Sequence, residues 1–257
     1  MAQHGLAFLL AIIVWWLSTA LIIVLCALPR RTFGWSFAAA SSIAMAAIYG
    51  FARSAWSVDV AGTYFAFLSA LAIWGWIEMS FLMGFITGPR TAPCPEGARG
   101  WVRFGLALQT LLYHELTIAG AAVLLVAMSW NAPNQTGTSA FLILTAMRVS
   151  AKMNIFLGVP YLTDEFLPKR LDYLKSYFRK RRTNALFPLS VGLSALAAIL
   201  LVQKAMVAEA AQAGGYVLLF ALTALAILEH IFMIAPLPDA VLWRWMMPAK
   251  PIDKQLP

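Results

Sequence analysis

Long apolar segments separated by short polar connections dominate the pattern of this chain. About 20 consecutive apolar residues suffice for a helix to cross the hydrocarbon of a bilayer. Runs of this length predict membrane-spanning helices at residues 6–28, 36–55, 62–86, 103–130, 138–158, 185–207 and 214–236. The pattern therefore predicts an all-α, polytopic bundle of about seven transmembrane helices, which forms a single transmembrane domain over residues 1–257.

The composition supports this class. Of the 257 residues, 61% are hydrophobic and 12% are charged, whereas a soluble globular domain carries about twice that share of charge. The net charge of +8 would suggest nucleic acid as a partner for a soluble protein. Here the basic residues lie in the connections, where they indicate topology and contact with lipid. Nucleic-acid binding is therefore not expected.

The basic residues also alternate from one connection to the next, which predicts the orientation. The second and sixth connections hold only Arg53 and Lys204, both near span ends. The first, third and fifth connections and the C-terminal tail hold many more: Arg30, Arg31, Arg90, Arg99, Arg103, Lys169, Arg170, Lys175, Arg179, Lys180, Arg181, Arg182, Arg244, Lys250 and Lys254. By the positive-inside rule the odd-numbered connections and the C-terminus are cytoplasmic and the N-terminus is outside.

The fifth connection is the largest segment outside the spans, and residues 163–182 are predicted to form a basic, amphipathic interfacial segment. Leu171, Leu174 and Phe178 recur at i, i+3 and i+7, with Tyr177 beside them and basic residues elsewhere. This pattern is typical of a helix that lies on the cytoplasmic leaflet with its apolar face toward the lipid. Membrane lipids are the expected partner, and an acidic protein is the alternative.

Polar side chains also occur within four of the predicted spans. They are Glu78, His114, Glu115, Arg148, Lys152, Asn154, Glu229 and His230. Counted from the predicted cytoplasmic span ends at about 1.5 Å per residue, the ionisable members lie roughly 9–17 Å from the inner interface. We therefore predict that they share one layer in the inner half of the bilayer. Arg148 and Lys152, at i and i+4, share a helix face and supply two cations for the three carboxylates.

Three roles are open for this layer. It is a structural ion-pair network that fixes helix packing, a ligand site, or a relay for protons or ions. In a ligand site, His114 or His230 contacts the central metal of a tetrapyrrole, or a carboxylate–histidine set binds iron or zinc. The Glu-x-x-His spacing of di-iron bundles is absent. Because no catalytic motif is present, a non-enzymatic role is favoured, and a membrane metalloenzyme that modifies a pigment or a lipid is the alternative.

Seven short blocks, spread over nearly the whole chain, carry a family resemblance. They are residues 15–19 (WWLST), 28–33 (LPRRTF), 74–81 (WGWIEMSF), 113–116 (YHEL), 150–154 (SAKMN), 228–230 (LEH) and 236–240 (PLPDA). In these blocks the chain resembles the PuhE-type family of photosynthetic complex assembly protein 2, found in purple and related phototrophic bacteria.

The resemblance implies a multi-pass protein of the bacterial inner (intracytoplasmic) membrane that affects reaction-centre assembly and bacteriochlorophyll production. On this basis we expect an assembly factor that influences the supply or insertion of bacteriochlorophyll. The expected partners are reaction-centre or light-harvesting subunits, or pigment-synthesis proteins. The expected ligand of His114 or His230 is bacteriochlorophyll or a precursor. The resemblance supplies no catalytic residues.

Overall fold

Seven long α-helices make up most of the computed structural model, which describes residues 2–162 and 167–235. The helices are α1 (Ala2–Ala27), α2 (Phe33–Ser54), α3 (Val60–Leu82), α4 (Gly100–Met128), α5 (Thr136–Leu157), α6 (Leu186–Val207) and α7 (Ala210–Phe232). All seven are long and apolar enough to cross a membrane. The predicted all-α, seven-span fold is therefore confirmed.

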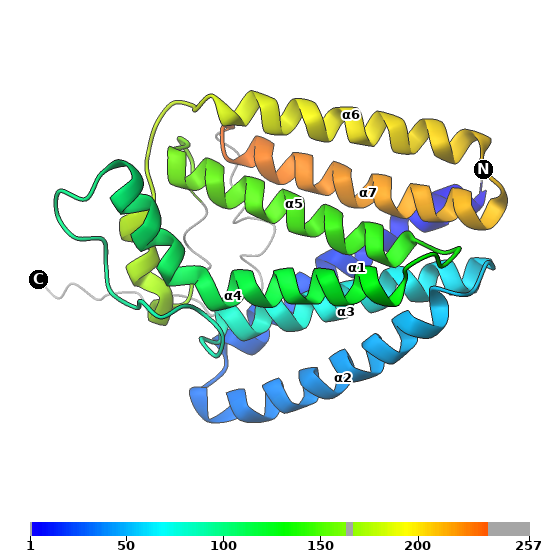
Figure 1. Cartoon of the computed structure of the whole chain (residues 1–257), viewed down its shortest axis with the longest axis horizontal. Coiled ribbons are helices and arrows are strands. Elements are labelled where there is room, and N and C mark those ends of the chain that lie inside the picture. Colours follow the sequence, from blue (N-terminus) through cyan, green and yellow to red (C-terminus); the bar gives the residue numbers. More distant parts are fainter. Residues whose placement is uncertain (1, 163–166, 236–257) are drawn as a thin grey trace, which may run out of the picture.

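Helix α3 occupies the centre of the bundle. It buries 12 of its 23 residues and packs against α1, α2, α4, α5 and α7. In Figure 1 the helices α6, α7, α5, α3 and α2 follow one another across the molecule, with α4 in front of α3 and α1 behind it. This arrangement surrounds α3 and α5 with other helices, so polar side chains on them can find partners.

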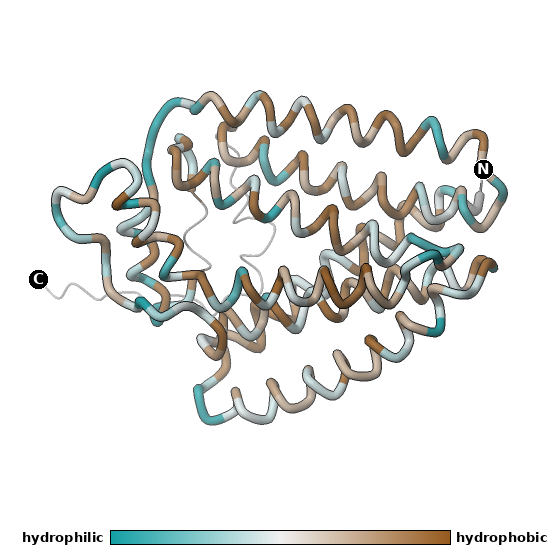
Figure 2. The backbone as a smooth tube through the Cα atoms, viewed as in Figure 1, coloured by the Kyte–Doolittle hydropathy of each residue, from teal (hydrophilic) through white to brown (hydrophobic). Residues whose placement is uncertain are grey.

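Apolar side chains fill the interior and also cover the outside of the helices. Phe67, Phe141 and Leu218 are fully buried, whereas Leu17 on α1 and Leu193 on α6 are more than half exposed. Figure 2 shows the same division, with hydrophobic colours along the helices and hydrophilic colours concentrated in the connections. A surface of this kind is suited to lipid, in which the helices satisfy their own backbone hydrogen bonds.

The start of α3 is fixed by a side-chain cap. Asp59 Oδ1 accepts hydrogen bonds from the Gly62 N–H at 2.6 Å and from the Ser57 hydroxyl at 3.0 Å. These bonds, led by the one from Gly62, hold the pKa of the exposed Asp59 carboxyl below its usual value. An N-cap acceptor satisfies backbone N–H groups that the first turn of a helix leaves unpaired.

We expect Asp59→Ala to unfold at a lower temperature than the wild-type protein at pH 7, and this difference to vanish in acid. Because the folded-state pKa lies below the unfolded-chain value of about 3.9, the cap stabilises the fold above that value. This stabilisation is lost as the pH falls through the folded-state pKa. Thermal unfolding of the purified protein in detergent measures the effect. The control Asp59→Asn keeps a capping acceptor, and a pH-independent deficit in Asp59→Ala would contradict the role of the charge.

Two spans end four residues earlier than the sequence predicts, whereas the other five end within two residues of the predicted position. Helix α3 ends at Leu82 instead of 86, because Gly84 adopts a left-handed φ of 78°. The Gly84 N–H donates to Phe81 O at 2.9 Å and the Phe85 N–H to Ser80 O at 2.9 Å, which is the Schellman motif that terminates helices. Helix α7 ends at Phe232 instead of 236. Glu78 and His230 consequently lie about one turn or less from the ends of their helices, and not the roughly two turns that the sequence predicts.

Within the segment that the sequence predicts to be interfacial, residues Lys169–Tyr177 form a 3-10 helix, η2. Its apolar residues Leu171 and Leu174 are buried against Phe81 of α3, with Leu111 of α4 packed beside them. In Figure 1, η2 lies beside the first turns of α4, beyond the end of the bundle. The apolar face of this segment therefore contacts protein instead of lipid, because α3 and α4 offer apolar side chains there.

Several predictions of the sequence are not tested by this fold. The orientation, with the N-terminus outside and the C-terminus cytoplasmic, stays a prediction. Residues 163–166 of the expected interfacial segment lie outside the described residues, as do block 236–240 and the tail cations Arg244, Lys250 and Lys254.

Candidate functional site

The connection after α3 is joined to the backbone of α4. The His114 N–H donates to Thr87 O at 2.9 Å, and the Arg90 N–H donates to Gln109 O at 3.4 Å. Gly88 makes this approach possible, since a Cβ at that position would overlap the backbone of Gln109 and Thr110. Figure 1 shows α4 bent, with its first turns leaning away from the bundle. A segment that engages the backbone groups of a helix is an identifiable cause of such a bend.

Next to this junction, three of the predicted site residues meet. Glu78 of α3 accepts a hydrogen bond from Arg148 of α5, with 3.0 Å between Oε2 and Nη2. The other oxygen of the carboxylate, Oε1, lies 3.9 Å from Nε2 of His114 on α4. His114 is fully buried, and the ring of Phe81 covers it with 4.5 Å between ring centroids. Helices α3, α4 and α5 thus converge on one carboxylate.

A second ion pair lies one turn along α5. Lys152 Nζ donates to Glu115 Oε1 at 2.5 Å and joins α5 to α4. Both side chains are largely covered, with exposed fractions of 19% and 23%. The predicted cation pair of Arg148 and Lys152 therefore faces two carboxylates on two different helices. We refer to Glu78, His114, Glu115, Arg148 and Lys152 as the charged cluster.

The opposite side of α5 carries uncharged polar contacts. The hydroxyl of Ser150 lies 2.9 Å from Nε2 of His230 on α7, whose Nδ1 lies 2.9 Å from Ala226 O. Asn154 Nδ2 donates to Ser190 Oγ of α6 at 3.1 Å and to Ser150 O at 3.0 Å. We refer to Ser150, Asn154, Ser190 and His230 as the neutral cluster.

Helix α5 thus divides the predicted layer into two groups. Successive residues of an α-helix are about 100° apart, so Arg148 and Lys152 share one face while Ser150 and Asn154 share another, about 200° away. The charged face meets α3 and α4, and the neutral face meets α6 and α7. Glu229 on α7 forms no ion pair with another described residue, although it lies within electrostatic range of Arg148 and Glu78 of the charged cluster. His114 and His230 consequently do not form one site.

Several members of these groups were not anticipated from the sequence. Ser150 and Ser190 complete the neutral cluster, and Phe81 covers His114. Asn184, in the connection before α6, also donates to Gly158 O at 2.9 Å. The i, i+4 spacing of Ser150 and Asn154 was available as a signal, because it mirrors that of Arg148 and Lys152. Nothing in the hydropathy pattern singles out Phe81 or Ser190.

Four buried polar atoms in the charged cluster have no hydrogen-bond partner within residues 2–162 and 167–235. They are Glu78 Oε1, Arg148 Nε and both ring nitrogens of His114. A buried polar atom without a partner costs about 1–3 kcal/mol. The cluster can therefore accept a polar group of a ligand, and the imidazole of His114 can offer a nitrogen lone pair to a metal centre.

A protein-bound iron or zinc ion is not favoured by this geometry. Among the described residues, no three His, Cys, Asp or Glu side chains converge in a way that could hold a metal ion. One reason is that His114 and His230 contact different faces of α5. Residues 2–162 and 167–235 therefore supply no group of metal ligands for the metalloenzyme alternative.

Seven apolar spans that enclose ion pairs among α3, α4 and α5 define a polytopic helical membrane protein with a charged interior. The chain belongs to the family described as "Protein of unknown function (DUF3623)", whose sequence profile matches residues 1–254. It is similar to the Rhodobacter capsulatus protein described as "Uncharacterized 30.4 kDa protein in puhA 5'region", with 40% identity over 258 residues that cover 97% of this chain and 93% of the relative. No solved structure matches the chain.

Proposed function

We propose that the protein is an assembly factor for the bacterial photosynthetic complex and acts in the bacterial inner (intracytoplasmic) membrane. The observation that carries this proposal is the position of the relative, described as lying in the puhA 5′ region, at 40% identity over nearly the full chain. This position indicates a photosynthesis-gene context. The seven spans support a site of action within the bilayer. The partners in this role are reaction-centre or light-harvesting subunits, or pigment-synthesis proteins.

Within this role, His114 is the candidate contact for bacteriochlorophyll or a precursor. Its ring nitrogens have no partner among the described residues, whereas each ring nitrogen of His230 is engaged, one by Ser150 and one by Ala226. The central metal of a tetrapyrrole can be coordinated by the lone pair of one imidazole nitrogen. His114 therefore has a ring nitrogen available to coordinate such a metal. Both ring nitrogens of His230 are already used in contacts within the bundle.

Access to His114 requires a local movement. Phe81 covers the ring and Glu78 lies 3.9 Å from Nε2, so the side chain is fully buried. The Glu78–His114 contact is longer than the Glu78–Arg148 ion pair at 3.0 Å, and it is the contact that opens at the smaller energetic cost. A ligand then reaches Nε2 while Arg148 continues to hold the carboxylate.

The two histidines provide a matched test. In a pigment-producing phototrophic host that lacks its own copy, the wild-type protein is expected to restore reaction-centre absorbance. His114→Gln is expected to leave absorbance at the level of the host without the protein, and His230→Gln to restore it. The purified wild-type protein is expected to show a tetrapyrrole absorption band that His114→Gln lacks.

One outcome would refute the role in assembly, and another would refute only the ligand at His114. Unchanged reaction-centre levels in the host without the protein would refute the role in assembly. Colourless protein that restores reaction-centre absorbance in full would refute the ligand at His114 and leave the role in place, with the charged cluster acting as a structural network.

A further inference from the structure

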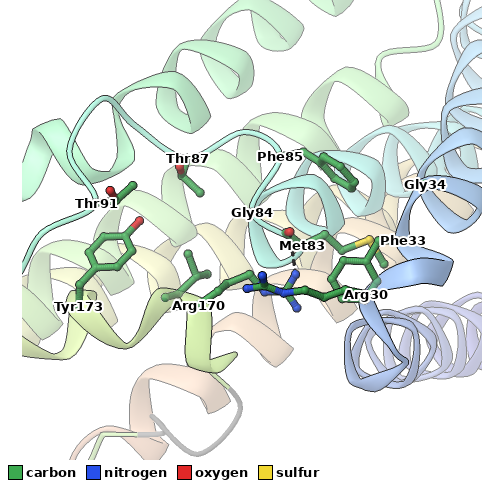
Figure 3. Close-up of a pocket in the computed structure, with 11 residues that line it drawn as sticks. Arg30, Phe33, Gly34, Met83, Gly84, Phe85, Thr87, Thr91, Arg170 and Tyr173 are labelled. Atoms are coloured by element: carbon green, nitrogen blue, oxygen red, sulfur yellow. Dashed lines mark hydrogen bonds between the residues drawn. The ribbon is translucent and has the colours of Figure 1, made fainter.

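A cavity of about 440 Å³ lies at one end of the bundle, and none of the residues of the charged cluster lines it. Three segments that are distant in sequence line it: the start of α2 with the preceding 3-10 turn η1 (Arg30–Thr32), the residues after α3, and η2. Figure 3 shows the side chains of these segments facing one another. The volume lies within the range of small-molecule sites, roughly 300–1,000 Å³.

The cavity has a marked excess of positive charge. Arg30 and Arg170 both line it, and no carboxylate of the described residues does. Asp172, the acidic residue of η2, instead pairs with Lys175 at 3.0 Å. Two guanidinium groups at one cavity repel each other, and an anion placed between them offsets this repulsion.

Arg170 is held in position by the ends of two helices. It donates to Met83 O at 2.7 Å and to Cys26 O at 3.5 Å, and its guanidinium lies 4.3 Å from the centre of the Phe33 ring. Burial, and to a lesser extent Arg30, lowers the pKa of Arg170 from its usual value. A guanidinium has five N–H donors, so donors remain for a ligand after these bonds are made.

The other walls of the cavity are suited to an amphipathic ligand, because they present both polar and apolar side chains. The hydroxyl-bearing side chains of Thr87, Thr91 and Tyr173 line the side away from the arginines in Figure 3, while Phe33 and Phe85 provide apolar surface. The cavity also lies at the level where α1 and α3 end and α2 begins. This is the level at which the headgroups of a bilayer meet the ends of membrane-spanning helices.

We propose that this cavity binds a phosphate group between Arg30 and Arg170, and that the phosphate belongs to the headgroup of an anionic phospholipid. Guanidinium groups bind phosphate oxygens through paired, charge-assisted hydrogen bonds. Basic pockets between membrane helices on the cytoplasmic side bind anionic headgroups, and the positive-inside prediction puts Arg30 and Arg170 on that side. The apolar walls accept the start of the acyl chains.

The test measures lipid binding to the full-length protein in detergent, by native mass spectrometry and by thermal stability. Phosphatidylglycerol, with a net negative charge, is expected to bind more tightly and to raise the unfolding temperature more than zwitterionic phosphatidylcholine. Arg30→Gln is expected to weaken phosphatidylglycerol binding about tenfold, which corresponds to about 1.4 kcal/mol. Arg30 is exposed, so this variant is expected to fold, whereas Arg170 also supports the helix ends.

Arg31→Gln is the matched control, since Arg31 is an exposed neighbour on the same 3-10 turn and does not line the cavity. An equal loss of binding in Arg30→Gln and Arg31→Gln would overturn the proposal, because it would indicate general attraction to a basic surface. Inorganic phosphate is added as a separate arm. Stabilisation by phosphate alone, abolished by Arg30→Gln, with none by the lipid, would keep the phosphate site and reject the lipid as its source.

Discussion

Replacing Glu115 with alanine is expected to lower the free energy of unfolding by about 3 kcal/mol or more. The variant leaves the ammonium of Lys152 without its carboxylate in a position that is largely covered by protein. A charge of this kind within a membrane span has no water to replace the lost partner. Unfolding of the purified protein in mixed detergent micelles, followed by circular dichroism, measures the change.

The charge pair itself can be separated from loss of packing by a double-mutant cycle. Glu115→Ala combined with Lys152→Met is expected to recover most of the lost stability, because both charges are then removed together. The exposed pair of Asp172 and Lys175 is the matched control, and Asp172→Ala is expected to cost less than about 1 kcal/mol. Additive losses in the double variant would show that Glu115 and Lys152 do not interact.

Gly88→Ala is expected to destabilise the protein by about 1–3 kcal/mol. The added Cβ would overlap the backbone of Gln109 and Thr110 on α4. The connection must then move away, and the hydrogen bond from the His114 N–H to Thr87 O is lost with it. Thermal unfolding in detergent measures the effect, and restoration of reaction-centre absorbance in the host measures its consequence at His114.

Gly105→Ala provides the control on the same helix, because a Cβ there meets nothing within 4 Å beyond the adjacent backbone of α4. This variant is expected to be neutral or stabilising by up to about 1 kcal/mol, since alanine favours helix more than glycine does. Wild-type stability in Gly88→Ala would mean that the connection does not lie against α4 as described.

The sequence predicts the seven spans well because the thickness of a bilayer sets the length of each apolar run. It also places Arg148 and Lys152 on one face of α5, which follows from helix geometry alone. Their partners could not be assigned in this way. That Lys152 meets Glu115 and Arg148 meets Glu78 depends on which helices lie beside α5, and hydropathy does not determine helix order.

A single layer describes these residues too coarsely, because the depth of a residue along a helix does not determine its angle around the helix axis. The sequence predicts similar depths for His114 and His230, but the two residues contact different faces of α5. The fifth connection shows a related limit. The spacing of Leu171 and Leu174 identifies an apolar face, but it does not distinguish lipid from the end of α3 and α4 as the surface that covers it.

The two polar faces of α5 also bear on how the chain enters the membrane. Each charged residue at the centre of a span adds about 2.5–3.5 kcal/mol to the free energy of insertion, and α5 carries Arg148 and Lys152 as well as Asn154. This helix is therefore poorly suited to partition alone into lipid from the translocon. Its cations require the carboxylates of α3 and α4, which are synthesised earlier, and Ser150 and Asn154 require α6 and α7, which are synthesised later. We expect α5 to remain beside its predecessors at the translocon until the last two helices emerge, so that its insertion is coupled to completion of the chain.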